Sequence, residues 1–188
     1  MTRKITCYLL EPTEVAEVSL RRFTYSSSAT PCVHEWGHDA KATIGQMPYP
    51  FANQLEGEHT LDGVDRADPR WPTHCVACQY EFMPADQWQV GKTRMYRHPG
   101  TGDLTVLGQA PVGSMWIASW LKGTSFAKSP DGDVLVVRTP GGDWVVDGPA
   151  SGGGWWTRTG TPPNITVTPS IICGSYHGWL RDGQLEEC

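Results

Sequence analysis

The segment TPCVHEWGHDA, residues 30–40, sets two imidazoles and a carboxylate at a spacing that can do metal chemistry. His34 and His38 are four residues apart and Glu35 follows the first, which gives the pattern H-E-x-x-H. On a helix, two such histidines share one face and bind zinc, and the glutamate acts as general base for hydrolysis. Glu35 is therefore a candidate catalytic residue, provided that a third protein ligand leaves one coordination position open to water.

The segment CVACQYEF offers a second pair of candidate ligands. Cys75 and Cys78 bracket two residues ahead of a turn and an aromatic residue, which is typical of a knuckle that presents two thiolates to one metal ion. The alternative is a pair of reduced cysteines in a hydrophobic core. A structural zinc site needs four ligands, so the knuckle predicts two further ligands elsewhere in the chain.

Residues 30–40 are the best source of those two ligands, and they allow two combinations with the knuckle cysteines. If residues 31–44 are helical, His34 and His38 complete a Cys2His2 site with the knuckle. If they form a turn, Cys32 and His34 give a Cys3His site. Either combination ties two distant segments together, which is the task of a structural Zn²⁺. We favour it over the hydrolase, because nothing downstream singles out a third ligand for an open site.

A short helix is one of the elements that would position these ligands. Thr30 can cap it, Pro31 suits its first turn and Gly45 can end it. Over 31–44 the apolar residues then fall on one stripe, with the two histidines on an adjacent face.

The remaining elements are predicted to be strands. KITCYLL and EVSLRRFTYS have the composition of paired strands, and from Asp131 onward the pattern is all-β, with turns at Pro-Gly-Gly and Asp-Gly. We therefore expect a mainly β fold with short helices (α+β). A boundary near residue 125 would separate a zinc-stabilised, knuckle-containing region, residues 1–125, from a β-rich module, residues 126–188.

The composition limits which classes of partner the protein is expected to bind. The net charge is −5 and the chain has no block rich in lysine and arginine, which argues against nucleic acid. No apolar stretch approaches the roughly 18 residues of a membrane span, and the first apolar run is too short for a signal peptide. We expect a soluble protein made in the cytosol, with cysteines that hold metal rather than disulfides. Nine tryptophans can build a core or an adhesive surface.

The tail TVTPSIICGSYHGWLRDGQLEE, residues 166–187, is the most individual stretch. Its Thr-x-x-Pro-Ser-Ile strand, its cysteine followed four residues later by histidine, and its closing hairpin resemble the end of the DUF6527-type family. The upstream segments RWPTHC, DQWQV and TPGGDWVVDGPAS are similar to proteins of tailed phages, especially those that infect actinobacteria. The resemblance implies a small zinc-binding phage module.

The family's zinc pattern would carry over to Cys173 and His177 as a second metal pair. The chain departs from that pattern at the first pair, where VVRTPGGDW has no cysteines. The second site is then lost, shared with the knuckle, or completed by Cys7 or Cys188. The alternative, a core cysteine and a hydrogen-bonded histidine, is slightly favoured.

These observations predict a zinc-stabilised phage protein without enzymatic activity. The resemblance implies a minor or accessory component of the virion head or tail, whose partners are capsid or tail proteins. The alternatives are a zinc metallohydrolase that uses HEWGH and an interaction protein directed at a host protein in the host cytoplasm. Nucleic acid and membranes are not expected partners.

Overall fold

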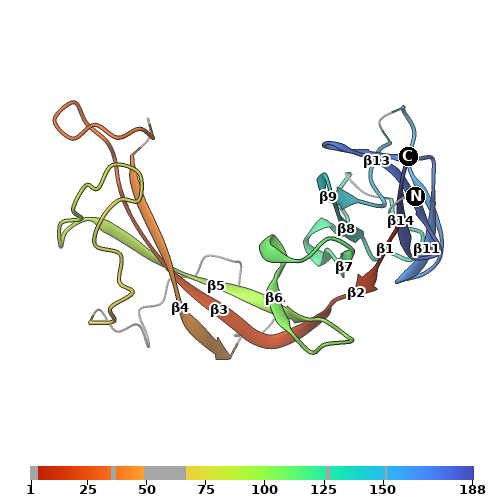
Figure 1. Ribbon diagram of the computed structural model, residues 1–188, viewed down its shortest axis with the longest axis horizontal. Coiled ribbons are helices and arrows are strands. Elements are labelled where there is room, and N and C mark those ends of the chain that lie inside the picture. The colour runs from red at the N-terminus through yellow and green to blue at the C-terminus, as the bar shows by residue number, and fades with distance from the viewer. Residues whose placement is uncertain (1–3, 35–36, 49–66, 126–127, 151) are drawn as a thin grey trace. The chain divides into compact units, whose positions relative to one another are not determined.

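The computed structural model describes residues 4–34, 37–48, 67–125, 128–150 and 152–188 (Figure 1). Contacts within the chain define two compact units. We call Met1–Glu11 together with Tyr96–Cys188 the terminal unit, and Pro12–Met95 the inserted unit. The predicted boundary near residue 125 falls inside the terminal unit. The physical reason is that the first strands of the chain pair with strands from its C-terminal half.

The expected fold class, mainly β with short helices, is confirmed. Among the described residues the helices are two 3-10 turns of three residues each. None of them is long or apolar enough to cross a membrane. The strands of the inserted unit are β3 (Glu11–Thr24), β4 (His38–Pro48) and β5 (Gln87–Arg97). The elements of the terminal unit are β1 (Lys4–Thr6), β2 (Tyr8–Leu9), β6 (Leu104–Val106), η1 (Leu107–Gln109), β7 (Ser114–Ile117), η2 (Ser119–Leu121), β8 (Leu135–Thr139), β9 (Gly142–Val145), β10 (Thr157–Thr161), β11 (Asn164–Thr168), β12 (Ile171–Cys173), β13 (Tyr176–Arg181) and β14 (Gln184–Glu187).

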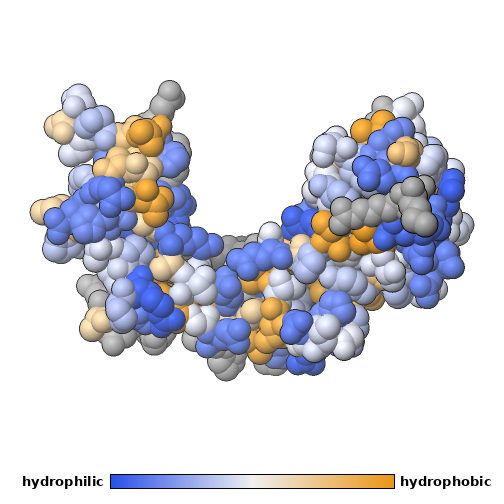
Figure 2. All heavy atoms as spheres, viewed as in Figure 1, coloured by the Kyte–Doolittle hydropathy of each residue, from blue (hydrophilic) through white to orange (hydrophobic). Residues whose placement is uncertain are grey.

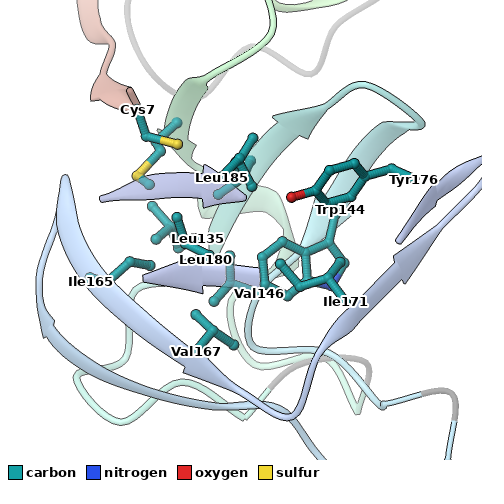
Figure 3. Packing of buried hydrophobic residues seen from close by; sticks show 12 residues of the cluster. Cys7, Leu135, Trp144, Val146, Ile165, Val167, Ile171, Tyr176, Leu180 and Leu185 are labelled. Carbon is teal, nitrogen blue, oxygen red and sulfur yellow. The ribbon is translucent and has the colours of Figure 1, made fainter. Parts of the chain in front are cut away.

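The terminal unit is built from small sheets and has two hydrophobic clusters, the smaller of which contains Leu10, Tyr96, Ala110, Trp116, Ala118, Val134 and Val136. One sheet has the order β1-β14-β13-β12, a second has the order β2-β7-β8-β9, and β10 pairs with β11. Side chains alternate between the two faces of a strand, so one face of each sheet can be apolar. The inward faces contribute the core in Figure 3, which contains Cys7, Met115, Leu135, Val137, Trp144, Val146, Ile165, Val167, Ile171, Tyr176, Leu180 and Leu185.

A buried ion pair connects β10 to the segment after β9 in the terminal unit. The side chains of Arg158 and Asp147 are 3% and 2% exposed, and Arg158 Nε lies 2.8 Å from the Asp147 carboxylate. The same guanidinium donates to Asp131 at 2.6 Å, and the backbone N–H of Leu135 donates to Asp147. The two buried charges are therefore paired and hydrogen-bonded, as burial requires.

The inserted unit contains the sheet order β4-β3-β5. β3 and β4 are antiparallel from the pair Val15 and Pro48 to the pair Thr24 and His38, with one irregularity in register. The Thr13 hydroxyl donates to the Met95 carbonyl at 2.7 Å, so the first and last residues of the unit lie close together. Its sheet core contains Val18, Leu20 and Val90, packed against Ile44, Trp71 and Trp88.

The helix predicted over residues 31–44 is wrong, because β4 begins at His38. From residue 38 to 44 the even positions are His, Ala, Ala and Ile and the odd positions are Asp, Lys and Thr, which is the period-two pattern of a strand. Gly37 has φ +154°, and a Cβ there would meet the Thr24 carbonyl oxygen at 2.4 Å. Trp36, which the helical stripe required, lies outside the described residues.

Candidate metal centre

Four side chains in the inserted unit converge on one point. They are Cys32, His38, Cys75 and Cys78, and their ligand atoms all lie within 4.8 Å of one another. His38 Nδ1 is 3.1 Å from Cys78 Sγ, and the Sγ atoms of Cys32 and Cys75 are 4.0 Å apart. Three sulfurs and one imidazole nitrogen at this spacing fit a tetrahedral zinc ion.

A short hairpin forms the knuckle. The backbone N–H of Cys75 donates to the Tyr80 carbonyl at 2.8 Å, and that of Phe82 donates to the Thr73 carbonyl at 2.9 Å. The backbone N–H of Gln79 donates to the Cys75 carbonyl and closes the turn. Gln79 has φ +61°. Few non-glycine residues adopt this left-handed conformation. The hairpin thus places both cysteines at its tip.

Backbone donors surround the buried sulfur of Cys75. The N–H of Asp39, in β4, points at Cys75 Sγ from 3.4 Å. Burial raises the pKa of this thiol, but the N–H groups of Ala77, Asp39 and Cys78 outweigh it and lower the pKa to about 6. The thiolate is the form that binds metal, so these backbone donors favour the ligand state of Cys75.

His38 is oriented by two neighbours. It is 1% exposed, and its Nε2 lies 3.1 Å from the Thr30 carbonyl oxygen. A carbonyl only accepts, so Nε2 carries the proton and Nδ1 presents its lone pair to the sulfurs. The ring also stacks on Tyr80, with centroids 4.0 Å apart. Nδ1 is therefore the atom that would bind the metal.

Cys32 comes from the loop between β3 and β4. Ser27 and Thr30 exchange backbone hydrogen bonds at 3.1 Å and their hydroxyls lie 2.8 Å apart, which closes a turn just before the cysteine. Cys32 packs with Ala40, Phe82 and Tyr80 in a small apolar cluster around the site. The loop thus supplies the ligand Cys32, and its Thr30 carbonyl orients the ligand His38.

The structure brings together a combination of the predicted ligands that neither alternative contained. Cys32 and His38 join the knuckle cysteines, whereas His34 is exposed and does not belong to the group. Both alternatives relied on His34, and the helix that would have placed it beside His38 is absent. Glu35, the candidate general base, lies outside the described residues.

The second predicted pair does not form a joint site, because Cys173 and His177 lie on opposite faces of the hairpin of β12 and β13. Cys173 pairs with the buried Tyr176 and packs against the core. His177 pairs with Ile172, which is 53% exposed, and is itself exposed. In the described part of the chain, the only group of three or more potential metal ligands is the one at the knuckle. Cys7 lies in the core and Cys188 is exposed.

Some supporting groups gave no signal in the sequence. The Thr30 carbonyl and the Asp39 amide act through the backbone, which any residue provides. Tyr80 did give a signal, since an aromatic residue after C-x-x-C was part of the knuckle pattern.

No family model, curated protein or solved structure matches the chain. The protein is a β-rich chain of two units, one of which carries a Cys3His cluster suited to a metal ion.

Proposed function

We propose that the inserted unit is a structural zinc module and that the protein is a non-enzymatic binding protein. The observation that carries this proposal is the group of four ligand atoms within 4.8 Å, supplied by two segments that are 43 residues apart at Cys32 and Cys75. A bound Zn²⁺ would hold the loop, the start of β4 and the knuckle together. Its binding free energy would then be folding free energy.

The number of ligands supports a structural role over a hydrolytic one. Catalytic zinc sites keep three protein ligands and one open position, whereas structural sites are closed by four. The cluster offers four protein ligands. The hydrolase would need His34 beside His38, and the start of β4 at His38 removes the helix that would bring them together.

Exposed apolar side chains of the inserted unit support a role in protein binding. Tyr25, Val33, Val76 and Met83 are 76%, 75%, 70% and 58% exposed, and all four belong to the inserted unit. Val33 and Val76 directly follow two of the ligands in sequence. Figure 2 shows apolar residues interrupting the hydrophilic surface of this unit. Exposed apolar patches commonly mark interaction sites.

The biological setting is proposed from the resemblance of the tail to phage proteins. A minor head or tail component of a virion is the first candidate, with capsid or tail proteins as partners. A soluble protein directed at a host protein is the second. Proteomic analysis of purified particles separates them, since a virion component is present at a fixed copy number and a host-directed protein is absent.

Metal content per chain, measured by mass spectrometry on protein purified without added metal, tests the zinc module. We expect one zinc in the wild type, none in Cys75→Ser and one in the control Cys173→Ser. Zinc retained in a folded Cys75→Ser protein would contradict the proposal. Hydrolytic activity that disappears in Glu35→Gln, with the metal retained, would establish the hydrolase instead.

A further inference from the structure

A buried arginine lies next to the metal centre without being part of it. Arg22 is 6% exposed and belongs to β3, where it pairs with Ala40 of β4. Its guanidinium donates to the Pro72 carbonyl at 3.2 Å and to the Met83 carbonyl at 2.7 Å. The Phe82 ring lies 5.0 Å from the guanidinium carbon.

The two carbonyls occupy equivalent places on the two stems of the knuckle hairpin. His74 is bridged to Glu81 and Thr73 is bonded to Phe82, so residues 72 and 83 come next on the ladder. Arg22 thus joins the two stems at the open end of the hairpin, opposite the tip that carries the cysteines.

The chemistry of the guanidinium suits this task. It is planar, permanently charged and presents donors in a fixed fork, so one side chain can hold two carbonyls at a set separation. A lysine ammonium is a compact point charge on a flexible stem and fixes no such separation. A buried cation is costly unless it is well bonded, and here it bonds both stems and faces an aromatic ring.

We propose that Arg22 is a positioning residue of the metal centre, which fixes the knuckle against the strand pair that carries His38. This inference rests on the proposed zinc module. β3 holds Arg22, and β4, its neighbour, begins with His38. Two of the four ligands reach the site on the hairpin that Arg22 holds. The geometry of the metal site therefore depends on this side chain, which acts through the two carbonyls of the hairpin.

The test uses the full chain with Arg22→Lys and Arg22→Gln, and Arg70→Gln as control. Arg70 is exposed, pairs with Asp68 and lies five residues before Cys75. Cobalt(II) replaces zinc as a spectroscopic probe, and zinc affinity is measured by competition with a chromophoric chelator. Loss of a group that hydrogen-bonds a metal ligand directly weakens metal binding by about 10- to 100-fold, so loss of the more remote Arg22 should weaken it by up to about tenfold. We expect that loss in both Arg22 variants, with altered ligand-field bands at saturating cobalt, and no change in the control.

The spectrum distinguishes positioning from general support of the fold. Metal binding drives folding, so the spectrum at saturation can be recorded even where the metal-free variant is unfolded. A merely structural Arg22 would lower stability and leave the saturated spectrum as in the wild type, and that result would overturn the inference. A wild type that binds neither zinc nor cobalt would instead refute the zinc module itself.

Discussion

Removal of the metal should unfold the inserted unit selectively. A zinc ion held by Cys32 and Cys75 would close a loop of 43 residues. In the chain-entropy treatment of cross-links, such a loop corresponds to about 4 kcal/mol of stability at 25 °C. A domain has a total stability of about 5–15 kcal/mol, so this contribution alone is a large share.

Hydrogen exchange with mass spectrometry provides the assay, because it reports each unit separately. Each 1.4 kcal/mol is a factor of ten, so amides of β3 and β4 should exchange about a thousandfold faster after chelation under reducing conditions. Peptides from β8 and β13, in the terminal unit, serve as the internal control and should keep their protection. Re-addition of zinc should restore the slow exchange of β3 and β4.

The result that would refute this reasoning is a change of less than tenfold in β3 and β4 when the metal is removed. The four side chains would then be neighbours without a metal that holds them. Equal loss of protection in β8 and β13 would refute the selectivity, since those strands contain none of the ligands.

Three further predictions concern other residues. Gly37→Ala should destabilise the inserted unit by about 1–3 kcal/mol in denaturant titrations. Gly45→Ala, at a similar φ of +151° but with no atom within 4 Å of the added Cβ, should cost less, and equal losses would contradict the steric argument. The side-chain hydrogen bond from Arg158 lowers the pKa of Asp131 below its ordinary value. The ionised Asp131 therefore stabilises the fold above about pH 4, and this stabilisation is lost as the pH falls further. Asp131→Asn should therefore be less stable than the wild type at pH 7, and the difference in stability should shrink below pH 4. A difference that does not change with pH would contradict a role for the ion pair. Burial raises the pKa of Cys7 to about 12, so iodoacetamide at pH 8 should alkylate the exposed Cys188 and spare Cys7 until the protein is unfolded, as peptide mapping can show.

The knuckle was predictable because its information is local. C-x-x-C followed by a turn and an aromatic residue specifies a hairpin with two sulfurs at its tip, and the structure has this hairpin. The β-rich character was predictable for the same reason, since alternation and turn residues act over a few positions.

The choice of histidine was not predictable from spacing alone. His34 and His38 fit a helical face, but residues 38–44 also alternate with period two, and the long pairing with β3 decides between them. Such pairing is a tertiary effect that overrides local helix signals. The boundaries of the two units were not predictable for a related reason, because β1 pairs with β14 at the other end of the chain.

The closeness of Thr13 to Met95 has a consequence for how the gene could be altered. A segment whose entry and exit points are neighbours can be cut out and its ends rejoined by a short linker, or grafted into another host loop, with little demand on the recipient. We therefore expect the inserted unit to be transferable as one piece. A fragment for producing the metal centre in isolation should extend to Arg97, so that β5 stays whole.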